Sequence, residues 1–265
     1  MIKAIFFDID GTILSFATHK MLPSSIAAIE KIKDNGVRVF ISSGRPKVLI
    51  PNFPVAFDGY ITVNGGHCAV GDEVLLRNPF SRATTLRWLD YVRRNDLTTM
   101  CFTEYGMCVN RIDAAGMALQ QQLGFEMPPL VPLDEMIEWE TSGHNNEDNA
   151  VYQFIAMQPA ERDREAMAAI GPCRMPRWHP AFTDIIPDGS SKAVGMQHII
   201  DYLGIRRDET MAFGDGGNDV EMLEFAGIGV AMGNASDEVK AHANYVTADC
   251  ESDGISLALS HFEVL

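Results

Sequence analysis

Short apolar runs recur in the first and last parts of the chain, and most of them end in a polar or glycine-containing turn. They have the length and composition of buried strands, and they cover residues 5–7, 37–41, 60–63, 210–213, 228–232 and 245–246. Segments with helical spacing of apolar residues lie between them. One is expected to begin at Ser24 or Ser25 and to end at Asn35-Gly36, and another covers 193–203. Because strands that alternate with helices build parallel sheets, the pattern predicts an α/β fold with a doubly wound, mostly parallel sheet.

The middle of the chain has a different pattern. Its strand-like runs are 99–103, 107–110, 151–157 and 181–186, and its helical segments lie near 84–94, 114–123 and 161–170. Glu104-Tyr105-Gly106 separates the first two runs, which predicts a hairpin. Residues 134–150 hold six acidic residues and no Lys or Arg, which favours a solvated loop. We therefore expect a core domain of residues 1–79 and 188–265, interrupted by an inserted α+β domain of residues 80–187.

Composition narrows the classes of function. The 265 residues are 46% hydrophobic, enough for a folded core. No stretch reaches the roughly 18 consecutive apolar residues of a membrane helix, and the N-terminal residues lack the apolar region of a signal peptide. The formal net charge of −15 opposes binding to nucleic acids or anionic membranes. A small-molecule phosphate ester remains a candidate substrate, because a few local cations can dominate the field within one cleft.

The cysteines indicate a reducing, cytoplasmic environment. Five cysteines without CxxC spacing argue against a disulfide framework or a zinc site. Cys101 and Cys108 lie in apolar runs and are expected to be small core residues. We also expect a monomer or a weak homo-oligomer.

Two carboxylates follow the first strand, in Asp8-Ile9-Asp10-Gly11-Thr12. Two charges about 4 Å apart repel each other by roughly 4 kcal/mol at an effective dielectric near 20. A hard divalent cation such as Mg²⁺, which takes carboxylate and carbonyl oxygens and keeps substrate phosphate in its shell, would offset that repulsion. The alternative is an ordinary Asp-Gly turn with solvated carboxylates.

Polar groups also follow the other predicted strands. Ser43-Gly44-Arg45 comes after 37–41, Asn64 after 60–63, and Gly214-Asp215-Gly216-Gly217-Asn218-Asp219 after 210–213. Lys192 stands near the start of a predicted helix, where a solvated surface lysine is the alternative. Open α/β sheets bind ligands at the carboxyl ends of their strands, so these groups are expected to form one site.

The four motifs around Asp8, Ser43, Lys192 and Asp215, taken in this order, resemble those of the haloacid dehalogenase-like hydrolases, and within them the Cof-type bacterial sugar phosphatases. The resemblance spans nearly the whole chain. It implies that the inserted domain is a cap that selects the substrate.

The resemblance also implies the roles of the acids. Asp8 would be the nucleophile that forms an aspartyl-phosphate, and Asp10 would be the general acid and base. Asp8, the backbone carbonyl of Asp10 and Asp215 would hold Mg²⁺. Asp219 would complete the metal site by fixing metal-bound water, or would orient Lys192.

The remaining roles concern the phosphate and the organic part of the substrate. Lys192 would balance charge on Asp8 and the transferring oxygens, and Ser43, chosen over Ser42, would bind the phosphoryl group. The candidate phosphate- and substrate-binding residues are Gly11, Thr12, Ser43, Gly44, Arg45, Asn64, His179, Asp184 and Asn218.

The function expected from the sequence is therefore Mg²⁺-dependent hydrolysis of small phosphomonoesters, with sugar phosphates as the expected substrates. A phosphosugar mutase would use the same first steps and return the phosphoryl group to a sugar. A non-catalytic phosphosugar sensor would lack one of Asp8, Asp10, Lys192 or Asp215, and this chain has all four.

Overall fold

The computed structural model describes residues 1–104, 106–112, 114, 117, 128–142, 150–177 and 180–265. The chain divides into two compact units. The core unit comprises Met1–Gly44, Pro51–Arg77 and Ser191–Leu265, and the inserted unit comprises Arg45–Ile50 and Asn78–Ser190. The main limits of the inserted unit lie within a few residues of the boundaries 80 and 187 expected from the sequence. The assignment of residues 45–50 to the inserted unit was not expected.

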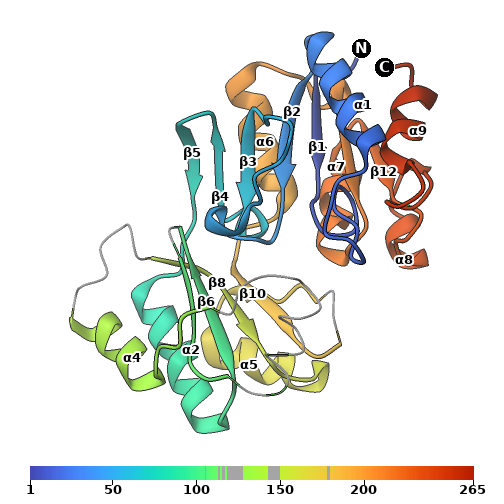
Figure 1. Ribbon diagram of the computed structural model, residues 1–265. Helices are drawn as coiled ribbons and strands as arrows, with labels where there is room; N and C mark the ends of the chain where they lie inside the picture. Colours follow the sequence, from blue (N-terminus) through green and yellow to red (C-terminus); the bar gives the residue numbers. More distant parts are fainter. Residues whose placement is uncertain (105, 113, 115–116, 118–127, 143–149, 178–179) are drawn as a thin grey trace. The chain divides into compact units, whose positions relative to one another are not determined.

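The core unit, all of whose residues are described, is built on an eight-stranded sheet with the order β13-β12-β11-β1-β2-β3-β4-β5 (Figure 1). Its strands are β1 (Ala4–Phe7), β2 (Arg38–Ser42), β3 (Gly59–Thr62), β4 (His67–Val70), β5 (Glu73–Arg77), β11 (Thr210–Gly214), β12 (Ile228–Ala231) and β13 (Tyr245–Val246). Neighbouring strands from β13 to β3 are parallel, whereas β4 and β5 are antiparallel to their neighbours. The predicted mostly parallel sheet is confirmed, and the β4–β5 hairpin is an addition to it.

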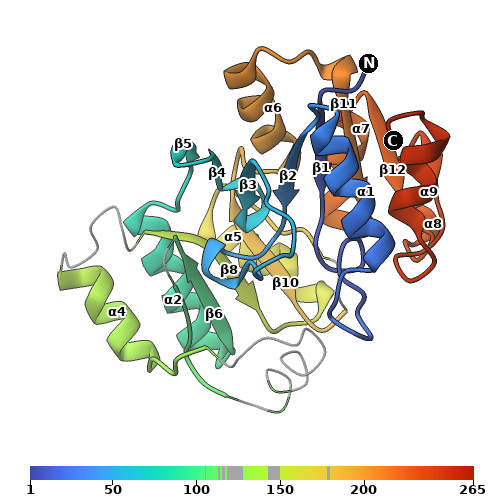
Figure 2. The ribbon, with the colours of Figure 1, turned by 45° about the horizontal axis from the view of Figure 1, so that its top comes forward.

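Helices cover both faces of this sheet. The helices are α1 (Pro23–Asp34), α6 (Lys192–Leu203), α7 (Val220–Phe225), α8 (Asp237–Lys240) and α9 (Gly254–His261). Helix α1 packs beside α9, and α6 packs beside α7 on the opposite face (Figures 1 and 2). Helix α1 begins at Pro23 after Leu22, so the expected start at Ser24 or Ser25 was wrong: the fixed backbone of proline suits the first helical position.

Alternation along the central strands supplies a core on each face, because successive strand side chains point to opposite sides. Phe6 stacks on Phe40 with ring centroids 5.0 Å apart and belongs to the cluster that contains Met196 of α6. Phe7 stacks on Phe213 at 5.1 Å on the other side. Such double-faced burial is typical of a doubly wound sheet.

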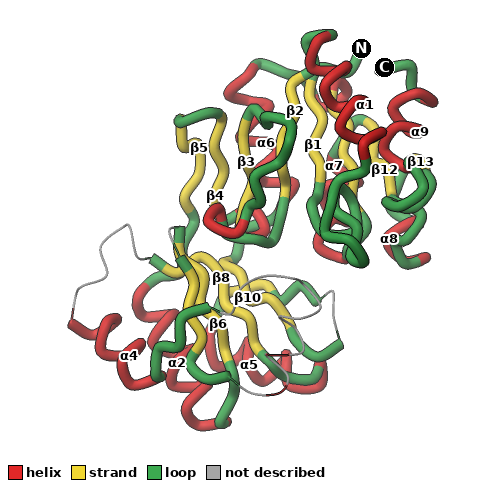
Figure 3. Tube along the Cα trace, in the orientation of Figure 1, coloured by secondary structure: helices red, strands yellow, loops and turns green. Residues whose placement is uncertain are grey.

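The inserted unit is an α+β module, as predicted. Its described strands form an antiparallel sheet with the order β7-β6-β8-β10-β9. They are β6 (Thr99–Thr103), β7 (Met107–Val109), β8 (Val151–Ala156), β9 (Cys173–Arg174) and β10 (Thr183–Pro187), and the described helices are α2 (Arg82–Asn95), α4 (Leu133–Ser142) and α5 (Asp163–Ile170). The three helices lie on one face of this sheet (Figure 3). The predicted hairpin at Glu104 is confirmed, and the helix predicted over 114–123 falls largely outside the described residues.

Helix α4 corrects the prediction of a solvated loop over 134–150 as far as residue 142, and residues 143–149 lie outside the described residues. Met136 is buried in the core of the inserted unit and Ile137 packs against it. Asp134 and Glu135 lie in the first helical turn, where negative charge favours the helix dipole. The density of acids suggested a loop, but Leu133, Met136 and Ile137 recur at helical spacing and pack the helix against this core.

Candidate active site

The predicted polar groups of the core unit stand at the ends of adjacent parallel strands. Asp8 follows β1, Ser43 follows β2, Asn64 follows β3, and Asp215 follows β11. Since these four strands are neighbours and point the same way, their carboxyl ends meet at one edge of the sheet. Lys192 enters this edge as the first residue of α6, whose preceding Ser191 accepts a hydrogen bond from the Val194 backbone N–H.

Lys192 is the centre of a buried ion cluster. Its Nζ donates to Oδ1 of Asp8 and to Oδ1 of Asp219, each at 2.6 Å, and its side chain is wholly buried. Burial alone would lower the pKa of Lys192, but the charges of Asp219 and Asp8 outweigh it and leave the pKa above its usual value. The lysine therefore remains an ammonium.

The carboxylates outnumber that ammonium. Asp8, Asp215 and Asp219 each place a carboxylate oxygen within 4.8 Å of the others. Burial, followed by repulsion from Asp219, raises the pKa of Asp8 well above its usual value, and the same causes raise the pKa of Asp215 to about 7. Oxygen donors with an unbalanced negative charge are what a hard divalent cation requires, so this donor set fits Mg²⁺.

Asp219 has little capacity left for a metal ion. One of its oxygens accepts from Lys192, and Oδ2 accepts from the backbone N–H groups of Asp215 at 3.1 Å and Gly216 at 2.9 Å. Of the two roles expected for Asp219, fixing metal-bound water or orienting Lys192, these hydrogen bonds favour the orientation of Lys192. The same bonds fix the turn that carries Asp215.

Asp215 accepts hydrogen bonds from side chains of two other segments. Thr12 Oγ1 donates to its Oδ1 at 3.3 Å, and Asn234 Nδ2 donates to its Oδ2 at 3.1 Å. The Asp215 carboxylate also explains Gly11, which has φ +83° and whose added Cβ would lie 2.1 Å from Asp215 Oδ2. Any other residue at Gly11 would be strained and would displace this carboxylate.

Asn234 is a site residue that sequence reasoning missed. Its Nδ2 donates to the Gly11 carbonyl at 2.8 Å as well as to Asp215, and its Oδ1 accepts from the Cys250 backbone N–H at 2.9 Å. One amide thus links the turn after β1 to the turn after β11. A signal was present, because Asn234 follows β12, the strand next to β11, at the same edge of the sheet.

The other predicted residues of the core unit gather on the β2–β3 side. Asn218 Nδ2 donates to Asn64 Oδ1 at 2.9 Å, and an added Cβ on Gly44 would lie 3.1 Å from the Asn64 amide. Ser43 is buried, and its carbonyl accepts from the Asn64 backbone N–H at 3.1 Å. Asp10, in the turn after β1, is half-buried.

Three predicted substrate residues do not belong to the described part of the core unit. Arg45 belongs to the inserted unit, and its Nη1 donates to the Leu49 carbonyl at 3.1 Å. Asp184 lies on β10 of the inserted unit and is buried. His179 lies outside the described residues. Their role in substrate recognition stays a prediction.

The neighbouring Arg177 organises the segment that leads into β10. Its guanidinium pairs with Asp163 at 2.8 Å and donates to the carbonyls of Pro180 and Phe182 at 3.0 and 2.7 Å. With its donors committed to these groups, Arg177 supports the backbone of this segment.

Comparison with known proteins assigns the family. A sequence profile of the haloacid dehalogenase-like hydrolases matches residues 5–259. The chain belongs to this family. The predicted Cof-type resemblance and enzyme class are confirmed with it: the protein is a phosphoric monoester hydrolase of the haloacid dehalogenase type.

Individual relatives cover the whole length of the chain. YkrA of Bacillus subtilis strain 168 is 30% identical over 266 residues, covering 99% of this chain and 98% of YkrA. The pyridoxal phosphate phosphatase YbhA of Escherichia coli K12 is 28% identical over 266 residues, covering 96% of both chains. The solved structure of the subclass IIB sugar phosphatase BT4131 is similar with a TM-score of 0.89 and 36% identity, covering 99% of this chain and 100% of that one.

Within the described residues, no helix combines the length and apolar character needed to cross a membrane.

Proposed function

We propose that this member of the family is a Mg²⁺-dependent phosphatase that hydrolyses small sugar phosphates through an aspartyl-phosphate on Asp8. The observation that carries the proposal is the buried Lys192 ammonium between Asp8 and Asp219, beside the partly buried Asp215. A buried cluster with more carboxylates than cations destabilises the folded protein. Its presence is explained if these residues carry out the chemistry.

Asp8 is suited to attack phosphorus. Oδ1 of Asp8 is held by Lys192, which leaves the other oxygen as the nucleophile in a fixed orientation. Mg²⁺ bound by Asp8, Asp215 and the Asp10 carbonyl would supply positive charge against the phosphoryl oxygens. Lys192 adds a second positive charge to the same group, and Asp219 keeps Lys192 in place.

Asp10 is proposed as the proton carrier. Its carboxyl group would protonate the leaving oxygen and would then take a proton from the water that hydrolyses the aspartyl-phosphate. Asp10→Asn should lower kcat by about 10² to 10⁴ and should cost more for an alkyl phosphate than for para-nitrophenyl phosphate. Equal losses for the two esters would contradict the acid role.

The phosphate subsite is proposed to involve Ser43 and Asn218, together with the backbone around Gly11, Thr12 and Gly44. Asn64 supports this group by holding Asn218. Neutral hydrogen-bond donors of this kind stabilise the negative charge on the phosphoryl oxygens in the transition state.

The substrate class rests on similarity. BT4131, a sugar phosphatase by name, aligns over the whole chain at 36% identity, whereas the pyridoxal phosphate phosphatase YbhA is 28% identical. Hexose phosphates are therefore proposed ahead of pyridoxal phosphate. Arg45, His179 and Asp184 are proposed to contact the organic part of the substrate from the inserted unit.

One assay series tests this proposal and its alternatives. Purified protein is given hexose phosphates, pyridoxal phosphate and para-nitrophenyl phosphate, with Mg²⁺ or with excess chelator. Release of free phosphate that requires Mg²⁺ and is fastest with a hexose phosphate is expected. Full activity in chelator would refute the metal site, isomer formation would indicate a mutase, and binding without turnover would indicate a sensor.

We further propose a cytoplasmic monomer or weak homo-oligomer. Size-exclusion chromatography with light scattering at several protein concentrations tests the second point, and a concentration-independent dimer or tetramer would contradict it.

A further inference from the structure

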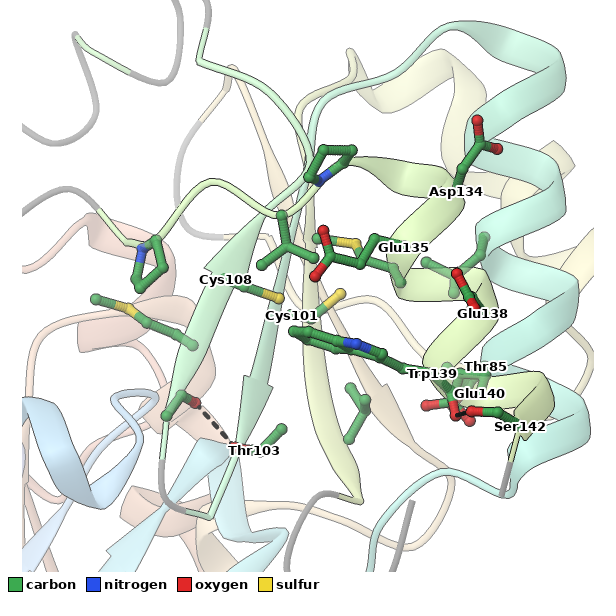
Figure 4. Close-up of a pocket in the computed structure, with 18 residues that line it drawn as sticks. Thr85, Cys101, Thr103, Cys108, Asp134, Glu135, Glu138, Trp139, Glu140 and Ser142 are labelled. Atoms are coloured by element: carbon green, nitrogen blue, oxygen red, sulfur yellow. Dashed lines mark hydrogen bonds between the residues drawn. The ribbon is translucent and has the colours of Figure 1, made fainter. Parts of the chain in front are cut away.

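A pair of cysteines in the inserted unit lies outside the proposed chemistry. Cys101 on β6 is directly opposite Cys108 on β7 in the antiparallel ladder. Both side chains are in the wall of a cavity of about 1060 Å³, which Trp139 of α4 also lines (Figure 4). The sequence predicted two small core residues on the strands of a hairpin, and the structure places them opposite each other.

The backbone pairing places the two cysteines at disulfide distance. Thr103 N–H donates to the Gly106 carbonyl, and Asn110 N–H donates to the Thr99 carbonyl. The Cys101–Cys108 pair is two residues from each of these hydrogen-bonded pairs, so it belongs to the same class. Cα atoms in that class are about 5.5 Å apart, inside the range of roughly 4.4 to 6.8 Å for disulfides. The Cβ atoms of such a pair are farther apart than the roughly 3.5 to 4.5 Å of a relaxed disulfide, so the bond requires a small local approach of the two strands.

The two thiols differ in reactivity. Cys101 donates a hydrogen bond to the Cys108 sulfur, which raises the pKa of Cys101 and lowers the pKa of Cys108. Cys101 is buried and Cys108 is half-buried. Burial raises the pKa of Cys68 to about 12 and of Cys173 and Cys250 to about 11. Since the thiolate is the nucleophile, Cys108 is the thiol best suited to react first.

We propose that Cys101 and Cys108 form a redox-active dithiol, a modification site at which hydroperoxides produce a reversible intramolecular disulfide. The Cys108 thiolate attacks one peroxide oxygen, the O–O bond breaks, and a sulfenic acid and hydroxide form. Cys101 sulfur then attacks the Cys108 sulfur and loses its proton, and the hydroxyl group leaves as water. Overall, two thiols and one hydrogen peroxide give one disulfide and two waters. A dithiol reductant reverses the modification.

The sequence allows a direct test by mass spectrometry. No Lys or Arg separates Cys101 from Cys108, so trypsin leaves both in the single peptide 95–111. Reduced full-length protein is treated with hydrogen peroxide, remaining thiols are alkylated, and the digest is weighed. The expected peptide has lost two hydrogens and carries no alkyl group, and dithiothreitol before alkylation restores both alkylation sites. Oxidation of Met100 or Met107 adds oxygen and is distinguished by mass.

Matched variants distinguish the roles of the Cys101 and Cys108 thiols. Cys101→Ser should leave a Cys108 sulfenic acid that dimedone traps, because the second thiol is missing, and Cys108→Ser should leave a Cys101 that peroxide does not modify. Cys250→Ser should form the 101–108 disulfide as the unmodified protein does. If Cys101→Ser unfolds, Cys101→Ala takes its place. The proposal is overturned if peptide 95–111 keeps both alkylation sites under conditions that oxidise Cys250, or if Cys101→Ser and the unmodified protein give the same products.

Discussion

Two groups of charged side chains, one in each unit of the molecule, differ sharply in their exposure to water. In the core unit the side chain of Lys192 is 0% exposed and its partners Asp8 and Asp219 are 9% and 1% exposed. In the inserted unit the ion pair between Arg93 and Asp134 leaves the side chains 50% and 89% exposed. The Lys192 cluster of the core unit is thus buried, whereas this pair of the inserted unit remains in water.

This difference in burial indicates which charged groups serve a function and which only lie on the surface. Each buried ion costs several kcal/mol of solvation that the pairing must return, and in the core unit one ammonium is shared among carboxylates. An exposed pair contributes about 0 to 1 kcal/mol and can be lost without consequence. We expect chemistry to depend on the core cluster and the inserted unit to affect the choice of substrate, and the predictions below test that division.

The largest effect is expected for Asp8→Asn. The amide keeps the shape of the nucleophile but almost none of its reactivity, so kcat should fall by about 10⁴-fold or more. Because the folded state raises the pKa of Asp8, its ionised form costs stability above that pKa, and the neutral amide should raise the unfolding midpoint at pH 8.

Phosphate release and thermal unfolding measure the two effects, with the exposed Asp72→Asn of the core unit as control. Residual activity above roughly one part in a hundred, after deamidation is excluded, would argue against the covalent route.

A paired substitution compares the two kinds of ion pair. Lys192→Met should lower the free energy of unfolding by about 3 to 5 kcal/mol, because it leaves buried carboxylates without their cation. Arg93→Met in the inserted unit should change it by less than about 1 kcal/mol. Urea unfolding at neutral pH without metal measures both values. Similar values for the two variants would mean that burial does not determine how much these ion pairs contribute to the free energy of unfolding.

The core unit was the easier unit to predict from the sequence. Its strands are buried on both faces and read as short apolar runs, so β1, β2, β3, β11 and β12 were anticipated, and so were the polar residues that follow the first four of these strands. The β4–β5 hairpin was missed, although Gly71-Asp72 between two apolar runs is a turn signal. In the inserted unit, acidic composition concealed α4, whose stability comes from the packing of Met136.

Contacts between distant segments limited the prediction of the site. Asn234 was passed over because its partners Gly11 and Asp215 lie far away in the sequence and come together only through the strand order of the sheet. The role of Asp219 was left open, because a carboxylate at that position suits a metal ion and a lysine equally. Hydrogen bonds to both of its oxygens favour the lysine.

Asn234→Ala should sharpen the account of the core unit. Without the amide, Asp215 loses one of the hydrogen bonds that orient it, so the Mg²⁺ concentration for half-maximal activity should rise by about 10- to 100-fold. Asn244→Ala is a matched control, because Asn244 Oδ1 accepts from the Gly229 backbone N–H at 2.7 Å away from the acid cluster. A lower kcat with unchanged Mg²⁺ dependence would show that Asn234 acts on something other than the metal ligand.

The smallest effect is expected in the inserted unit. Asp184→Asn should reduce kcat/KM for a hexose phosphate and spare para-nitrophenyl phosphate, which has no sugar hydroxyl groups to recognise. Loss of one hydrogen bond is worth about 0.5 to 1.5 kcal/mol, so a decrease of a few-fold to tens-fold is expected. Asp188→Asn, an exposed acid in the same unit, should leave both substrates unchanged. Because Asp184 is buried, the unfolding midpoint must be measured beside the kinetics. Equal losses on both esters with folding intact would show that Asp184 does not select the substrate. Other residues of the inserted unit would then have to account for substrate selection.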